Sequence, residues 1–254
     1  PEYKANRKVH RRLNRTNFHD GINEEEAMKR QIVSLFDYLE TLPVKTMMFD
    51  GMEADDVIGY VCSNLYPDSE KVIYSMDKDF YQLVNDKVSV YSPIKKMTID
   101  EKWIDHEFGM TPNNYLIYRT LDGDKSDDID GVKGCGHKTL QKKLPLLFDE
   151  EIVNIDDVLK YSNEHKSEAK VLENISNDGK KLHRNYKLMQ LLDVDIPARA
   201  KSRIRSIMES NDGGLRRGSL HRMLLEDKMF DSFKNLDYWL RSSFTTLQAF
   251  LSSK

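Results

Sequence analysis

Cysteine is scarce in this chain, which contains only Cys62 and Cys135 among its 254 residues. Two lone thiols form no disulfide framework, and such sparse use of cysteine is typical of a reducing compartment. The sequence also lacks a long apolar run and a signal-like N-terminus, which argues against a membrane-spanning or secreted protein. We therefore expect a cytoplasmic protein that has no membrane partner.

A net positive charge is absent as well. The formal net charge is −3, whereas nucleic-acid-binding proteins commonly have a basic surface. The charges are unevenly distributed, however, because acids gather in a few short clusters and basic residues gather elsewhere. The average charge therefore does not exclude a nucleic-acid partner. The sequence contains no internal repeat or low-complexity tract, and it is long enough to bury a sizeable core.

Carboxylates form three short clusters, and each cluster stands at the edge of an apolar segment. The clusters are Glu53, Asp55 and Asp56, then Asp77 and Asp79, then Asp124 and Asp127. Like charges that a fold brings close together destabilise one another unless cations hold them there. The pattern favours a site for hard metal ions.

Local patterns predict where two of these clusters lie. The apolar run from Val72 to Tyr74 predicts a buried strand that ends just before Asp77, and open α/β sheets bind ligands at that end. Apolar residues at helical spacing over residues 53–66 predict a helix with the first cluster in its first turn. An acidic first turn also complements the helix dipole, so one such cluster alone is more often a helix signal than a ligand set. Three clusters at comparable positions favour metal.

The ligand type indicates which metal. Carboxylate oxygens without supporting histidine or cysteine favour Mg²⁺ or Mn²⁺ over zinc. Two or more such ions, about 3.5–4 Å apart, are the standard device for hydrolysing phosphodiesters. A helix-loop-helix calcium site does not fit: counting from Asp122, position six is Asp127 and position twelve is Lys133, and counting from Asp124, position six is Ile129.

A glycine-rich segment follows the third acidic cluster. Gly131, Gly134 and Gly136 precede Lys138 and a predicted helix over residues 140–147. Glycines before a helix let backbone N–H groups approach an anion, which favours a helix-hairpin-helix that grips a nucleic-acid phosphate. A nucleotide-triphosphate loop is disfavoured because His137 interrupts the Gly-Lys-Thr order. A structural turn between two helices explains the glycines equally well when they are taken alone.

Basic residues crowd the N-terminus with almost no acid between them. They are Lys4, Arg7, Lys8, Arg11, Arg12 and Arg15. Their i, i+4 spacing would give a helix one broad basic face suited to a phosphate backbone, and Tyr3 could stack on a base. Taken alone, such a run is usually a solvated face. Beside a metal site and a phosphate-binding hairpin, the nucleic-acid interpretation is the better one.

Taken in order, these motifs resemble those of the flap endonuclease, or 5′ nuclease, family, which includes phage exonucleases and the 5′ nuclease domain of bacterial DNA polymerase I. The shared motifs are Tyr3-Lys4-x-x-Arg7, Glu53-Ala54-Asp55-Asp56, Asp77-x-Asp79, Gly123-Asp124-x-x-Asp127 and Gly131-Val-x-Gly134-x-Gly136-x-Lys138. The match spans about residues 1–200. The C-terminal stretch weakly resembles the phage ribonuclease H branch.

The resemblance implies a PIN-like α/β 5′ nuclease fold with a helical arch and a helix-hairpin-helix (H3TH) region. It implies that residues 1–100 belong to the nuclease domain, with the arch at about 8–45, that residues 101–200 hold the hairpin region, and that residues 201–254 form a helical extension. It further implies metal ligands in the three acidic clusters and a phosphate-contacting pair, Lys4 and Arg7. Tyr3, Lys8, Arg11, Arg12 and the hairpin motif would contact DNA, and K⁺ would bind at the hairpin.

Members of that family have two strands, each with a ligand Asp, before the Tyr-Lys-x-x-Arg segment, and this sequence begins at that segment. We therefore expect about a quarter of the nuclease domain to be missing from it or supplied by a separate polypeptide. The implied activity is Mg²⁺- or Mn²⁺-dependent cleavage of DNA or RNA–DNA near a 5′ flap or end, in replication or repair. The resemblance also implies a monomer that has replication proteins as partners, and its phage branch implies a phage-encoded enzyme that acts in the host cytoplasm.

Two alternatives remain open. One is a noncatalytic branched-DNA-binding fragment or subunit that needs a separate N-terminal segment, and the other is a ribonuclease of the related small acidic-site fold. A further basic stretch has two interpretations as well: Lys201, Arg203 and Arg205, followed by Arg216 and Arg217, predict either a second duplex-binding strip or a solvated helix face.

Overall fold

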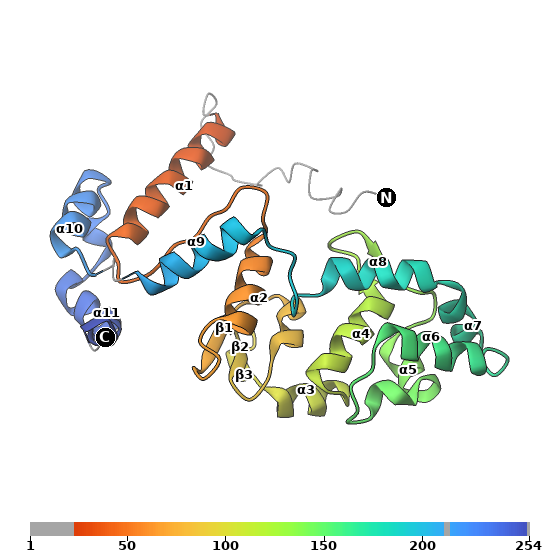
Figure 1. Ribbon diagram of the computed structural model, residues 1–254. Coiled ribbons are helices and arrows are strands. Elements are labelled where there is room, and N and C mark those ends of the chain that lie inside the picture. Colours follow the sequence, from red (N-terminus) through yellow and green to blue (C-terminus); the bar gives the residue numbers. More distant parts are fainter. Residues whose placement is uncertain (1–22, 211–213, 253–254) are drawn as a thin grey trace. The chain divides into compact units, whose positions relative to one another are not determined.

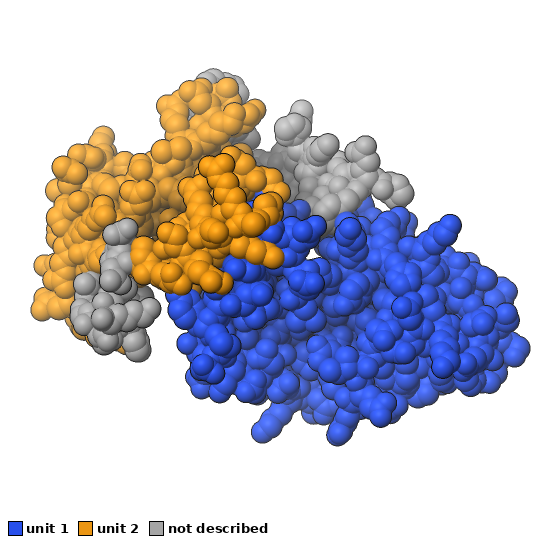
Figure 2. Space-filling model, viewed as in Figure 1, with its two compact units in different colours: residues 1–12, 52–196 blue, residues 13–51, 197–254 orange. Residues whose placement is uncertain are grey.

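The computed structural model of this chain describes residues 23–210 and 214–252, and contacts divide them into two units (Figure 2). Unit 1 consists of residues 52–196, and unit 2 combines residues 23–51 with the described residues after 196. Within unit 2, Tyr38 and Leu42 pack against the core of the C-terminal helices. The domain boundaries expected from the sequence, at about residues 100 and 200, stay a prediction.

Unit 1 contains a small mixed sheet in the order β1-β2-β3 (Figure 1). Strand β1 (Lys71–Tyr74) pairs in parallel with β2 (Val88–Ser92), which pairs antiparallel with β3 (Met97–Ile99). Ile73, Val90 and Ile99 lie in register across the strands and are buried on one face. The α/β fold and the strand predicted at 72–74 are therefore confirmed. The prediction that this strand is buried is wrong for two of its residues, because only Ile73 faces the core and Val72 and Tyr74 are exposed.

Helix α2 (Ala54–Asn64) confirms the helix predicted over residues 53–66, with Asp55 and Asp56 in its first turn. Between β1 and β2 the chain forms a buried 3₁₀ helix, η2 (Lys78–Leu83). Strand β3 begins at Met97 because residues 93–96 form a turn, in which Lys96 has φ +54°.

The rest of unit 1 is mainly helical, and a continuous apolar core joins its helices. Helix α4 (Pro112–Asp122) has a capped start, since the Thr111 hydroxyl accepts from Asn114 N and Pro112 occupies the first turn. The remaining elements are α3 (Glu101–Phe108), β4 (Gly123–Asp124), β5 (Ile129–Asp130), α5 (His137–Lys143), η3 (Pro145–Phe148), α6 (Ile155–Glu164), α7 (Lys170–Asn177) and α8 (Gly179–Met189).

The helix predicted over residues 140–147 is wrong in its extent. Helix α5 ends at Lys143, and a short 3₁₀ turn starts at Pro145. Proline lacks the N–H group that would continue the helix, and its ring clashes with the preceding turn. Leu140, Leu144 and Leu147 nevertheless all reach the core.

Unit 2 is built from helices α1 (Glu24–Glu40), α9 (Ala198–Glu209), α10 (Arg217–Glu226) and α11 (Leu236–Ser252), with a 3₁₀ turn, η4, at Phe230–Ser232. Its core consists of Leu220, Leu224, Leu236 and Leu240, against which Tyr38 and other partly buried side chains pack. Helix α1 lies within the predicted arch at 8–45, whose residues 8–22 are outside the described part. None of the described helices is both long and apolar enough to cross a membrane.

Candidate metal centre

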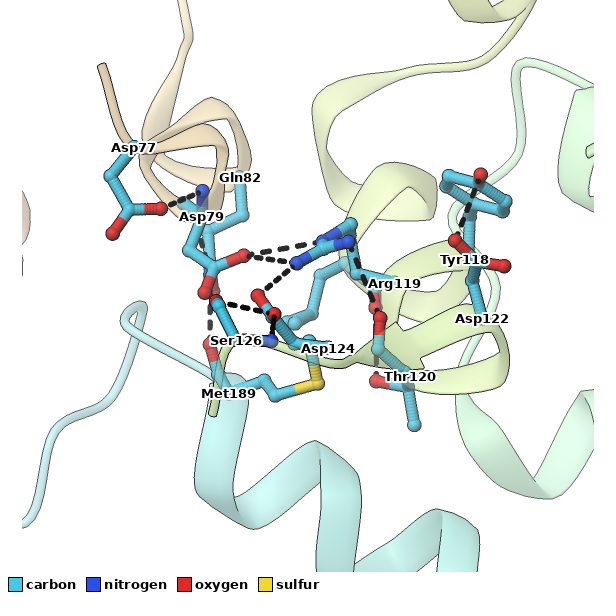
Figure 3. A network of polar contacts seen from close by, with 12 residues as sticks. Asp77, Asp79, Gln82, Tyr118, Arg119, Thr120, Asp122, Asp124, Ser126 and Met189 are labelled. Atoms are coloured by element: carbon cyan, nitrogen blue, oxygen red, sulfur yellow. Dashed lines mark hydrogen bonds and ion pairs between the residues drawn. The ribbon is translucent and has the colours of Figure 1, made fainter. Parts of the chain in front are cut away.

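The chain turns sharply after β1, and this turn presents Asp79. Asp77 is the N-cap of η2, and its Oδ1 accepts a hydrogen bond from the backbone N of Asp79 at 2.9 Å (Figure 3). A carboxylate at an N-cap satisfies a backbone donor that the helix leaves unpaired. Asp77 therefore fixes the backbone of the residue that enters the site.

Helix α4 delivers Asp124 through a close backbone crossing. Gly123 ends the helix with φ +79°, and a Cβ at this position would overlap the backbone of Gly131. A Cβ at Gly131 would in turn overlap the Asp122 carbonyl, and Val132 N donates to Leu121 O at 2.8 Å. Only glycine allows two backbones to approach so closely. The backbone before Asp124 is thereby held against the start of the glycine-rich motif at Gly131.

These turns bring three carboxylates from two distant segments into one group. Asp79, Asp124 and Asp127 each offer one oxygen, and the three oxygens lie within 4.8 Å of one another. Each of these residues is partly buried. The group thus draws on the second and third acidic clusters of the sequence, and its role as a metal site stays a prediction.

Arg119 on α4 lies between two of these carboxylates (Figure 3). Its Nη2 donates to Asp79 Oδ1 at 3.1 Å and to Asp124 Oδ2 at 2.6 Å, and its Nε donates to Asp79 Oδ1 at 3.2 Å. The Arg119 and Asp79 side chains are only 15% and 20% exposed. One guanidinium thus holds together two carboxylates that would otherwise repel each other.

The pKa values of the two carboxylates bound by Arg119 shift in opposite directions. Burial raises the pKa of Asp79 to about 6, with the nearby Asp77 adding to the effect and Arg119 opposing it. Burial also acts to raise the pKa of Asp124, but hydrogen bonds from Ser126 and the charge of Arg119 outweigh it, so that this pKa is lowered. Ser126 supplies both its backbone N and its hydroxyl to Asp124 Oδ1, at 2.7 and 2.6 Å. Asp79 is therefore the carboxylate whose charge is least compensated.

Buried Gln82 fastens Asp79 to the rest of unit 1. Its Nε2 donates to the carbonyl oxygens of Asp79 and Met189, and its Oε1 accepts from Leu191 N at 2.7 Å. Helix α2 rests against the same segment, because a Cβ at Gly59 would lie 2.5 Å from Leu191 O. The stretch after α8 thus connects the 3₁₀ turn bearing Asp79 with the helix bearing the first acidic cluster.

The other predicted metal ligands are not part of the three-carboxylate group. Glu53 is the N-cap of α2, Asp55 and Asp56 lie in its first turn, and Asp77 is exposed at the start of η2. Within the described ranges, none of these four joins a group of three acids as tight as that of Asp79, Asp124 and Asp127. Their assignment as ligands stays a prediction.

The predicted DNA-contacting residues divide into two sets. Tyr3, Lys4, Arg7, Lys8, Arg11 and Arg12 lie outside the described residues. The hairpin motif lies between β5 and α5, where Gly134 has φ +93°, Gly136 is the N-cap of α5 and the Lys138 side chain is exposed. The structure therefore has a glycine-containing turn that leads into a helix, as predicted. The contact of this turn with phosphate stays a prediction.

Sequence reasoning missed Arg119 and Gln82. Arg119 stands five residues before Asp124, and nothing nearby in the sequence identifies Asp79 as its second partner, 40 residues away. Gln82 follows Asp79 by one 3₁₀ turn, which is a weak local signal, but its bond to Met189 spans 107 residues.

The donor set fits a hard divalent ion. The group offers carboxylate oxygens from three residues, and oxygen donors are the ligands that Mg²⁺ and Mn²⁺ prefer. In the described residues neither histidine nor cysteine belongs to the group, which disfavours a zinc site.

Comparisons with known proteins agree with this geometry. Residues 1–109 match the family model described as the N-terminal resolvase-like domain of 5′-3′ exonuclease. A 5′-3′ exonuclease of Buchnera aphidicola is 32% identical over 185 residues, which are 69% of this chain and 62% of that protein. Over its first 109 residues this chain is similar to the 5′-3′ exonuclease family.

Another similar protein is the thermostable DNA polymerase I of Thermus aquaticus, 34% identical over 47% of this chain and 14% of that protein. The chain thus spans less than two thirds of the relatives it matches. A bacteriophage T5 flap endonuclease, solved with DNA and metal ions, superposes with a TM-score of 0.59 at 20% identity, over 92% of this chain and 78% of that one. The likeness confirms the 5′ nuclease fold.

Proposed function

We propose that this chain is a structure-specific, divalent-metal-dependent 5′ nuclease that hydrolyses phosphodiesters near a 5′ flap or 5′ end. The observation that carries the proposal is the convergence of Asp79, Asp124 and Asp127 in a chain that is similar to the 5′-3′ exonuclease family. Bound Mg²⁺ or Mn²⁺ ions would activate water and stabilise the leaving oxygen. Asp79, Asp124 and Asp127 would hold such an ion, with the α2 acids and Asp77 as further ligands.

In this proposal the chain's own residues prepare the site for a cation. Arg119 keeps Asp79 and Asp124 together, and Ser126 orients Asp124. Lys4 and Arg7 would bind the scissile phosphate and stabilise the charge that develops on it. The hairpin at Gly131, Gly134 and Gly136 would hold a duplex phosphate, with K⁺ beside it.

The biological setting is part of the same proposal. The relatives that the chain matches are bacterial exonucleases and DNA polymerase I, and the solved phage enzyme was captured with DNA. We infer a cytoplasmic monomer that acts on DNA, or on RNA–DNA hybrids, during replication or repair together with replication proteins.

The test is cleavage of a labelled 5′-flap DNA with Mg²⁺ or with a chelator, with binding measured in the same samples. Wild type is compared with Asp124→Asn and with the matched control Asp105→Asn, which removes one exposed carboxylate from α3. Loss of an outer partner of a metal commonly costs 10–100-fold in activity, so loss of a direct ligand should cost more than about 100-fold. The control should cleave like wild type.

If Asp124 is a metal ligand, its substitution should leave binding to the flap DNA intact. Asp124→Asn should bind the flap at least as tightly as wild type, because it removes a negative charge without removing a phosphate contact. Binding by wild type without cleavage in either Mg²⁺ or Mn²⁺ would contradict the proposal and favour the noncatalytic DNA-binding alternative.

A further inference from the structure

Helix α9 in unit 2 exposes a face of arginine and serine side chains, all of which can donate hydrogen bonds. Arg199, Ser202, Arg203 and Ser206 are all exposed, and their spacing of i, i+3, i+4 and i+7 places them on one side of the helix. We call these four residues the α9 strip. Ile204, on the other side, is completely buried. The orientation of α9 is therefore fixed by packing, and the α9 strip faces solvent.

The surroundings of the α9 strip are strongly basic. No aspartate or glutamate occurs from Pro197 to Met208, and exposed Arg216, Arg217 and Arg222 follow at the next helix. Among the described residues, no carboxylate pairs with Arg199, Arg217 or Arg222. This charge is unused by the fold of unit 2 and raises the local positive potential.

The fold itself uses a different cation on this helix. Lys45 donates to the carbonyl oxygens of Ile207, Met208 and Ser210 at 2.7, 2.5 and 2.6 Å, and so caps the negative end of α9. Arg203 lies over the ring of Phe49, 5.6 Å from its centroid. Stacking on a ring holds a guanidinium in place while its N–H edge stays available for an anion.

We propose that the α9 strip binds the phosphate backbone of a nucleic-acid duplex, independently of the metal centre. Arginine and serine side chains are donors that proteins use on phosphate oxygens. The strip contains no aromatic ring for stacking on unpaired bases and no large apolar side chain to anchor a protein or a lipid surface. The chemistry therefore favours a duplex over a single strand, an acidic protein or a membrane, and binding without regard to sequence.

The experiment measures binding of a labelled, blunt 20-base-pair duplex to the full chain in chelator, over a series of salt concentrations. The variant is the double substitution Arg199→Gln with Arg203→Gln. The matched control is Lys234→Gln with Arg241→Gln, which removes two exposed positive charges from the same unit. Because each phosphate contact contributes about 0.9 to the salt slope, the α9 variant should lower that slope by about 1.8, and the control should leave it unchanged.

A second pair of substitutions separates charge from folding. Arg199→Lys with Arg203→Lys retains both charges, so its salt slope should stay near that of wild type. An unchanged slope in the glutamine variant, or an equal loss in its control, would overturn the proposal. The proposal would also be overturned if the glutamine variant lost binding to polyglutamate while the salt slope of its duplex binding stayed intact. That result would make the α9 strip a protein-docking surface. Because no metal is present, these results are independent of whether the chain cleaves DNA.

Discussion

Asp79→Asn should stabilise the metal-free protein at neutral pH while abolishing its metal site. The carboxyl of Asp79 has a pKa of about 6 in the folded protein, against 3.8 for an unperturbed aspartate. At about 1.4 kcal/mol per pKa unit, this difference corresponds to roughly 3 kcal/mol. An asparagine resembles the protonated acid and still offers an oxygen to Arg119, so the variant should avoid that cost.

The sign of the effect depends on pH in a defined way. Between about pH 4 and pH 6 the folded protein retains the Asp79 proton and the unfolded chain does not, so the stability of wild type falls as the pH rises through this window. The variant has no such group to titrate. The two proteins should be equally stable near pH 3.5 and should differ by up to about 3 kcal/mol above pH 7.

Urea unfolding followed by tryptophan fluorescence measures this difference. The chain has two tryptophans, and Trp103 packs against Tyr81 in unit 1. A Trp239→Phe background therefore restricts the signal to the unit that contains Asp79. Mg²⁺ at about 100 times its dissociation constant should stabilise the background protein by roughly 2.7 kcal/mol and leave the Asp79→Asn variant unaffected. A variant that is less stable than its background at pH 7 without metal, or a difference that does not change with pH, would refute the reasoning.

Two further substitutions test the supports of the site. Arg119→Met removes the cation between Asp79 and Asp124 and should cost about 3–5 kcal/mol of metal-free stability, in part recovered by Mg²⁺; a loss that metal does not reduce would argue against a shared cation site. Gly59→Ala places a methyl group 2.5 Å from Leu191 O and should cost about 1–3 kcal/mol in thermal unfolding, whereas Gly218→Ala, which meets nothing within 4 Å, should be neutral or slightly stabilising. Equal effects of the two alanines would contradict the packing argument.

Local signals in the sequence were sufficient for the elements that carry the acids. The apolar run at 72–74 and the helical period over 53–66 each depend on neighbours a few residues away, and the structure has both elements. Helix α5 ends earlier than predicted for an equally local reason. Pro145 stops the helix, although the leucines around it have helical spacing.

The division of roles within the site could not be predicted in the same way. Asp77 and Asp79 are equivalent in a motif, yet the 3₁₀ turn makes the first a cap and buries the second. Arg119 reads from the sequence as a basic residue near a helix end, which complements the helix dipole. Its actual role depends on a carboxylate 40 residues away, which only the packing of α4 against η2 brings near.

The position of Arg119 shows how a site for a divalent ion can exist before the ion arrives. Three carboxylate groups whose oxygens lie within 4.8 Å of one another would repel, and the guanidinium of Arg119 reduces this repulsion by pairing with Asp79 and Asp124. The carboxylate oxygens remain donors of the kind that a divalent cation binds. Because Asp79 retains its proton below about pH 6, an ion that binds there in mildly acidic solution must displace that proton. Arg119 thus lowers the cost of assembling the carboxylates without removing their affinity for a cation.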